Sequence, residues 1–180
     1  MAGLPELETT RLLLRPLREG DKQFLASLDS DPMVMRYVHD GAMPQQEAFD
    51  FAELLIEMAP TRRSWGRWMV ELREPPTPVG WVELSKLWGP DRDDLQLGYQ
   101  FAPAHWGNGY ATGAAARVVR HGFEHLGLDR VMAVVRPENV ASVRVLAKAG
   151  FQRFGTRGEQ GKNACDLYRL TAEEWLEFRR

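Results

Sequence analysis

A glycine-punctuated segment, His105-Trp-Gly-Asn-Gly-Tyr-Ala111, has the clearest chemical potential in the sequence. The first four backbone N–H groups of a helix have no partner inside it, and the glycines at 107 and 109 lack the Cβ atoms that would keep an anion away. Such a turn can hold a pyrophosphate through backbone donors without a lysine. Two glycines are equally typical of an ordinary connection between a strand and a helix. The elements before and after the segment must therefore show whether it can bind a phosphate.

The residues on both sides of this segment predict a strand, a loop and a helix in that order. Leu95, Leu97, Tyr99 and Phe101 alternate with polar or small residues, which is the period of a strand with one buried face. From Ala111 to Leu126 the apolar residues recur at helical spacing instead. A phosphate-bearing cofactor is therefore expected at the start of this helix.

A second motif follows the short apolar strand predicted over Arg130–Val135. Asn139 and Ser142 open another helix, which is closed by Ala149-Gly-Phe151. Asparagine is a common N-cap and serine is frequent in the first turn, so this pair has an ordinary structural role available.

The order of these motifs resembles the GNAT acetyltransferase superfamily, in particular its ribosomal-protein N-terminal (RimJ/RimL-type) branch. The similarity covers roughly residues 8–170 and is far more specific than any one motif. The residues that carry it are Gly98-Tyr99, Trp106-Gly-Asn-Gly-Tyr-Ala111, Phe123-Glu-His-Leu-Gly127, Pro137-Glu-Asn-Val-Ala-Ser142 through Ala149-Gly-Phe151, and the opening Glu8-Thr-Thr-Arg-Leu-Leu-Leu-Arg15.

The resemblance implies an α/β (α+β) GNAT fold with a mixed, mostly antiparallel central sheet flanked by helices. It also implies acetyl-CoA as co-substrate, with no metal. In the family, the strand that spans Gln96–Phe101 here opens against its neighbour, and its free N–H groups receive the thioester carbonyl and the pantetheine arm. The expected cofactor-binding residues are Gln100, Phe101, Ala102, Trp106, Gly107, Asn108, Gly109, Tyr110, Ala111, Thr112, Asn139 and Ser142.

Acyl transfer from a thioester to an amine needs a neutral amine, a donor for the oxyanion and often an acid for the leaving thiolate. The tyrosine that many family members use as the acid falls at Leu146, which cannot donate a proton. Ser142 is therefore the best remaining acid, with Tyr99 and Tyr168 as alternatives.

The general base is the larger departure from the family. Gln96 and Gly113 stand where relatives commonly have glutamate, and a carboxamide cannot accept the proton of an amine. Glu83 on the preceding strand could replace it, provided that it shares a face with Gln96, and a register slip of one residue would reverse that. His39 and His105 are further candidates. The expected catalytic set is Ser142, Gln96 and Glu83.

The loop Asp31–Gly41 carries unusual bulk and, by the resemblance, helps to cover the acceptor site. We expect Met33, Tyr37, His39 and Trp81 to contact the acceptor; a partly buried connection is the alternative. Four tryptophans cluster in the predicted strands that follow, where large rings fill a core or form the wall of an apolar cleft: Trp65, Trp68, Trp81 and Trp88. The predicted acceptor is a primary amine, in particular the α-amine of a peptide or protein N-terminus or of an amino-acid-like small molecule.

The remaining pattern predicts a helix after Asp21 with that residue as its cap, and a proline-rich Glu74-Pro-Pro-Thr-Pro78 outside any strand. Thr171-Ala-Glu-Glu174 reads as a capping box. The other expected elements are strands at 11–16, 65–73, 79–87, 152–157 and 163–170 and a helix over Gln45–Met58.

Composition favours one domain over residues 1–180, because 44% hydrophobic residues in a chain of 180 can bury a substantial core. A net charge of −2 with scattered basic residues argues against nucleic acid and anionic membranes as partners. No apolar run approaches a membrane span, so a cytoplasmic protein, monomeric or homodimeric, is expected. A single cysteine, Cys165, excludes an internal disulfide and a multi-cysteine metal site.

Two alternatives belong to other functional classes. An NADP-binding βαβ unit would need a third glycine where Thr112 stands and a tighter turn than Ala102–Trp106 allows. A GNAT fold that binds acyl-CoA without turnover would be a sensor or interaction module.

Overall fold

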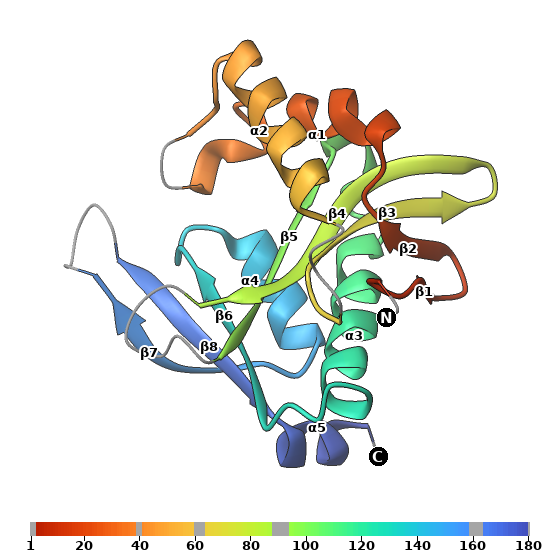
Figure 1. Cartoon of the computed structure of the whole chain (residues 1–180). Coiled ribbons are helices and arrows are strands. Elements are labelled where there is room, and N and C mark those ends of the chain that lie inside the picture. The colour runs from red at the N-terminus through yellow and green to blue at the C-terminus, as the bar shows by residue number, and fades with distance from the viewer. Residues whose placement is uncertain (1–2, 39–40, 60–63, 88–93, 159–163, 180) are drawn as a thin grey trace.

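The protein forms one eight-stranded sheet with helices packed against it (Figure 1). The computed structural model describes residues 3–38, 41–59, 64–87, 94–158 and 164–179. The strands are β1 (Leu7–Glu8), β2 (Leu12–Pro16), β3 (Arg67–Arg73), β4 (Pro76–Lys86), β5 (Leu95–Phe101), β6 (Arg130–Val135), β7 (Gln152–Arg157) and β8 (Cys165–Thr171). The α-helices are α1 (Lys22–Asp29), α2 (Gln45–Met58), α3 (Tyr110–Glu124), α4 (Val140–Lys148) and α5 (Ala172–Phe178). Short 3₁₀ turns lie at Glu19–Asp21, Met35–Tyr37 and Pro103–His105.

The strands are ordered β1-β2-β3-β4-β5-β6-β8-β7 across the sheet. All neighbouring pairs are antiparallel except β5 and β6, which α3 joins as a parallel crossover. The predicted GNAT-type α/β fold with a mixed, mostly antiparallel sheet is therefore confirmed. None of the described helices is long and apolar enough to cross a membrane.

Side-chain alternation along β3 and β4 divides the core between two faces of the sheet. Trp68 and Val82 join a cluster with α3 and α4, where Val118 and Leu146 are fully buried. Met69 and Trp81 point to the other face and pack with residues of α1 and α2. In Figure 1, α1 and α2 accordingly lie together at the top of the view, apart from α3 and α4. From Trp81 onward, the odd-numbered positions of β4 thus face α1 and α2.

The proline-rich segment was expected to stay outside the sheet, and this prediction is wrong. β4 begins at Pro76, with Thr77 opposite Leu72 and Pro78 opposite Glu71. A register shift between Val70 and Glu71 marks an irregularity in the ladder at this end. Prolines are tolerated at strand ends and next to bulges because these positions require fewer backbone donors.

Two predicted caps are confirmed and one is wrong. Asn139 accepts the Ser142 N–H at the start of α4, and Thr171 forms a capping box with Glu174. Asp21 precedes α1 but makes no cap bond to it. Its carboxylate instead accepts two hydrogen bonds from the buried Arg15 guanidinium, at 2.7 and 2.8 Å, because an ion pair is the stronger partner for a charge removed from water.

Candidate active site

The parallel pair β5 and β6 separates soon after it begins. The two strands are paired only at Leu95–Val131 and Gln96–Met132, whereas β5 continues along β4 to Phe101 and β6 along β8 to Val135. A wedge-shaped opening therefore splits the sheet, as the family resemblance implies.

Backbone polarity along β5 shows which groups face this opening. The Ala102 N–H donates to Val79 O and the Asp94 carbonyl accepts from Leu87 N–H, so even-numbered positions direct their backbone groups toward β4. Because this direction alternates along a strand, Leu97, Tyr99 and Phe101 direct theirs toward the opening. These are the donors and acceptors that an extended pantetheine chain could pair with.

The loop after β5 ends in a helix start that lacks a side-chain cap. Gly107 and Gly109 have φ angles of 78° and 76°, a left-handed conformation that glycine adopts without strain. Gly109 is the N-cap of α3, and the first helical bond runs from Gly113 N–H to Gly109 O at 3.0 Å. The N–H groups of residues 110–112 consequently have no helical acceptor. They lie next to an exposed stretch, residues 106–109, where an anion can reach them.

Two side chains fix this loop. The Trp106 indole donates to Phe101 O at 2.6 Å and ties the loop to the end of β5. Arg11 donates to Asn108 O at 3.0 Å and stacks on the Tyr110 ring, 4.9 Å from its centroid. Sequence reasoning gave Arg11 no role, although it lies in the opening motif; its position adds a positive charge beside the helix start.

Tyr99 and Ser142 meet across the opening. Their hydroxyl oxygens are 2.8 Å apart, and Tyr99 is also 3.2 Å from the Ser142 carbonyl, which it can donate to. Burial raises the pKa of Tyr99 to about 12, with the Ser142 hydrogen bond acting in the opposite direction, so the phenol stays neutral at physiological pH. Tyr168 and Leu146 lie buried in the α3–α4 core, which leaves Tyr99 as the tyrosine placed at Ser142.

The register of β4 and β5 answers whether Glu83 and Gln96 share a face. Glu83 is opposite Gly98, and Gln96 is opposite Ser85. Both side chains therefore lie on the α1–α2 face, in neighbouring cross-strand pairs of that face. Both oxygens of Glu83 are engaged: Oε2 accepts from Arg67 Nε at 2.9 Å and Oε1 from Ser85 Oγ at 3.1 Å. Glu83 therefore lies on the same face as Gln96, as a replacement base requires, but both of its carboxylate oxygens already accept hydrogen bonds.

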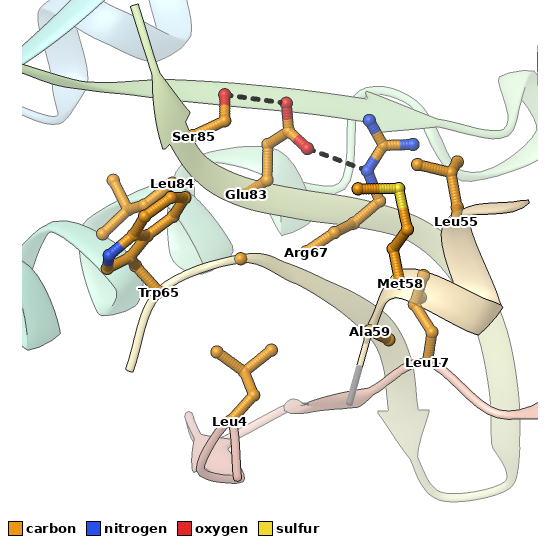
Figure 2. Close-up of a pocket in the computed structure, with 11 residues that line it drawn as sticks. Leu4, Leu17, Leu55, Met58, Ala59, Trp65, Arg67, Glu83, Leu84 and Ser85 are labelled. Carbon is orange, nitrogen blue, oxygen red and sulfur yellow. Dashed lines mark hydrogen bonds and ion pairs between the residues drawn. The ribbon is translucent and has the colours of Figure 1, made fainter. Parts of the chain in front are cut away.

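A small cavity of about 70 Å³ lies beside this network. Figure 2 shows Arg67, Glu83 and Ser85 forming its polar wall, while side chains such as Leu55 and Met58 of α2 form an apolar wall. An amine carried on an apolar group suits these surroundings.

The remaining predicted site residues fall in different places. Gln100 lies on the α1–α2 face, where it accepts from Trp81 Nε1 and donates to Met35 Sδ, both at 3.2 Å. Met33 is 61% exposed. Tyr37 stacks with Arg36, and His105 lies on the cofactor-side loop beside Tyr110. His39 is outside the described residues.

Comparison with known proteins decides the family. The acetyltransferase (GNAT) domain model matches residues 11–152. The chain belongs to the GNAT acetyltransferase family. It is 34% identical over 152 residues to the N-acetyltransferase YoaA of Bacillus subtilis, covering 84% of this chain and 85% of YoaA. It is 32% identical over 190 residues to the FsC-acetyl coenzyme A-N(2)-transacetylase of Aspergillus fumigatus, covering 98% and 80% of the two chains.

Solved structures agree with this assignment. A GNAT acetyltransferase from Bacillus anthracis superposes with a TM-score of 0.79 at 25% identity, covering 94% of this chain and 99% of the other. RimJ of Mycobacterium smegmatis in complex with CoA-disulfide gives 0.76 at 23% identity, with 97% and 91% covered. The predicted family is therefore confirmed, and this GNAT protein is an N-acetyltransferase.

Proposed function

We propose that this N-acetyltransferase moves the acetyl group of acetyl-CoA to the α-amine of a peptide or protein N-terminus, or of an amino-acid-like small molecule, by direct attack in a ternary complex. Residues 1–180 act as one domain, since strands from Leu7 to Thr171 share a single sheet. The observation that carries the proposal is the opening between β5 and β6, because the Tyr99–Ser142 pair joins β5 to α4 across it and the uncapped start of α3 follows the loop at the end of β5.

On the cofactor side, the N–H groups of residues 110–112 hold the pyrophosphate, and Arg11 contributes charge from beside the loop. The pantetheine chain extends along Leu97, Tyr99 and Phe101 as an additional strand would. Asn139 already uses its carbonyl oxygen to cap α4, so its Nδ2 is the end that donates to the pantetheine.

The reaction then uses backbone and hydroxyl groups. The neutral amine attacks the thioester carbon, a C–N bond forms, and backbone N–H groups of β5 stabilise the oxyanion. When the C–S bond breaks, Ser142 donates its proton to the thiolate and takes up the proton that the nitrogen loses as the amide forms, while Tyr99 supports the Ser142 oxygen by hydrogen bonding. Leu146 takes no part, since it is fully buried and has no proton to give.

The acceptor preference follows from the amine's own acidity. An α-amine has a pKa near 8 and a lysine-type amine one near 10.4, so the α-amine is far more often neutral at physiological pH. Gln96 cannot take a proton, and Arg67 and Ser85 occupy Glu83. The name of the Aspergillus relative, an N(2)-transacetylase, is in keeping with such an acceptor.

Calorimetry with acetyl-CoA, followed by thiol release against a panel of amines, tests the proposal. We expect micromolar binding, and higher kcat/KM for peptides with a free α-amine than for N-blocked lysine peptides or polyamines. Binding of CoA without turnover on any amine would instead identify a sensor. A preference for polyamines or lysine would contradict the assigned acceptor.

A further inference from the structure

Arg67, the first residue of β3, has a guanidinium group that the fold uses on one edge only. Its Nε donates to Glu83 Oε2 at 2.9 Å, and its central carbon lies 3.8 Å from the centroid of the Trp81 ring. Among the described residues, no hydrogen bond or ion pair involves its terminal nitrogens, Nη1 and Nη2. Four of the five N–H donors of this side chain are therefore unused.

The two terminal nitrogens are accessible, although the Arg67 side chain is only 14% exposed. Within the described chain, the fully buried side-chain nitrogens that lack a partner are Arg15 Nε and Arg117 Nη1, and those of Arg67 are not among them. Arg67 lines the cavity described above, and Figure 2 shows its terminal nitrogens turned away from Glu83. The fold thus leaves two donor groups of one guanidinium open to the cavity.

The way in which Arg67 is held differs from that of an arginine that serves only as an ion-pair partner. Such a guanidinium frequently pairs through its two terminal nitrogens, as Arg15 does with Asp21 at 2.7 and 2.8 Å. In Arg67 this forked edge is free, while the Trp81 ring and Glu83 fix the orientation of the group. A planar fork matches the two oxygens of a carboxylate.

The position of Arg67 suits an acceptor that approaches the thioester from the α1–α2 face. Arg67 is opposite Glu83 on β4, and Glu83 is opposite Gly98 on β5, so the three residues form one row across the sheet. A Cβ at Gly98 would lie 3.3 Å from Glu83 Oε1, and its three nearest atoms would all belong to Glu83. Gly98 therefore adds no side chain between this row and the cofactor chain proposed for the opening, which would lie one strand spacing of about 4.8 Å beyond β5.

We propose that Arg67 binds the carboxylate of an amino-acid acceptor through Nη1 and Nη2. This inference rests on the proposed acetyl transfer and selects one of its two kinds of acceptor, the amino-acid-like small molecule. A peptide N-terminus has an amide where a free amino acid has this carboxylate. In the bound amino acid a single carbon separates the carboxylate from the amine, which lies over Gly98 and is directed toward the opening.

Binding of the carboxylate also favours the reactive form of the amine. In a free amino acid, the negative carboxylate stabilises the neighbouring ammonium and raises its pKa. Pairing with the Arg67 guanidinium offsets that negative charge, so the bound ammonium loses its proton more easily. The amine can then attack in its neutral form even though Gln96 cannot accept a proton.

Matched pairs of substrates test the inference. We would measure kcat/KM for alanine and leucine and for their amides, which lack only the carboxylate. In Arg67→Gln, the ratio of kcat/KM for each acid to that for its amide should fall about tenfold to hundredfold, the range expected for hydrogen bonds to a charged group. The ratio cancels effects that both substrates share, such as a less well oriented Glu83. Arg73→Gln, at an exposed arginine of the same strand, is the matched control and should leave the ratio unchanged.

A binding measurement supports the kinetics without requiring turnover. Isocaproate is leucine without its amine, and isocaproamide also lacks the negative charge. Calorimetry in the presence of CoA should show that wild-type protein binds isocaproate at least tenfold more tightly than isocaproamide. Arg67→Gln should remove this difference, and Arg73→Gln should preserve it.

Two results would overturn the inference: equal losses for the acids and the amides in Arg67→Gln, or equal affinity of the wild-type protein for isocaproate and isocaproamide. Either would make Arg67 a structural partner of Glu83, and the proposed function would stand with a peptide or another α-amine as acceptor. Wild-type protein that acetylates no amine, but binds isocaproate in an Arg67-dependent manner, would overturn the proposed function and leave the carboxylate site standing.

Discussion

The Tyr99 hydroxyl lies 2.8 Å from Ser142 Oγ, which joins a residue of β5 to the first turn of α4 at the point where the sheet opens. The two are 43 positions apart in sequence, so the tertiary fold brings them together, beyond the last residues at which β5 and β6 are paired. A serine alone is a weak acid. Its oxygen is a better proton carrier when a neutral phenol hydrogen-bonds to it, because the charge that develops on the oxygen is then stabilised.

The first prediction concerns this pair. Ser142→Ala should lower kcat by roughly tenfold to a thousandfold, and Tyr99→Phe by a smaller factor, while both keep acetyl-CoA affinity. The double variant should be little worse than Ser142→Ala if the two hydroxyls act as one unit. Tyr168→Phe, which removes a hydroxyl from a core tyrosine, is the control. Multiplicative losses in a thiol-release assay would show that the hydroxyls act independently.

The pattern of the sequence was sufficient for the parts of this site that depend on local rules. The period-two run of β5, the glycines before α3 and the Asn139 cap follow from backbone preferences that operate over a few residues. The wedge-shaped opening was inferred only through family resemblance, because strand divergence leaves no local signal.

Relationships between distant segments could not be read in this way. Whether Glu83 shares a face with Gln96 depended on a register that a slip of one residue would reverse. The Arg67 and Ser85 bonds that occupy Glu83 come from the same tertiary arrangement. The burial of Asp29, the last residue of α1 and only 4% exposed, gave no signal in the sequence, since an acidic residue at the end of an amphipathic helix is expected to face water. Its burial results from α1 packing on the sheet.

A second prediction concerns stability at low pH. His121 is 5% exposed; burial lowers its pKa, while the hydrogen bond to Ser64 O at 2.9 Å acts in the opposite direction. Below the ordinary pKa near 6.5, the unfolded chain binds a proton that the folded chain refuses. The free energy of unfolding should therefore fall with decreasing pH, by up to about 1.4 kcal/mol per pH unit, until folded His121 itself titrates.

Urea unfolding at pH 8, 6.5 and 5.5 measures this effect. His121→Phe should be less stable at pH 8, because the bond to Ser64 is lost, but should have a flatter pH dependence below 6.5. His125→Gln, at the exposed histidine stacked on His121, is the control and should retain most of the wild-type slope. An unchanged slope in His121→Phe would assign the acid sensitivity to other groups.

The third prediction concerns the two glycines of α3 that differ in the space around them. A Cβ at Gly113 would meet Leu12 Cδ1 at 3.7 Å, an ordinary contact, whereas one at Gly122 would meet Leu128 Cδ1 at 3.1 Å. Gly113→Ala should therefore stabilise the protein by about 0.5–1 kcal/mol through helix propensity, and Gly122→Ala should gain less or lose stability. Thermal unfolding measures both. Full turnover in Gly113→Ala is also expected, since this position carries no catalytic group here; a loss of turnover there would contradict that.

The last prediction tests the pyrophosphate site at the start of α3. Substituting Gly109 with valine would confuse two effects, because a β-branched residue is strained at φ 76° whether or not it obstructs a phosphate. Thr112→Glu is cleaner: a carboxylate in the first helical turn suits the helix dipole and preserves stability, yet it repels a bound pyrophosphate. Acetyl-CoA affinity by calorimetry should fall at least tenfold. Ala116→Glu places the same charge one turn further along α3 and should weaken binding far less, since the effect of the helix terminus fades beyond the first turn. Equal losses in the two variants would mean that net charge matters rather than the helix start, and unchanged affinity in Thr112→Glu would locate the pyrophosphate elsewhere.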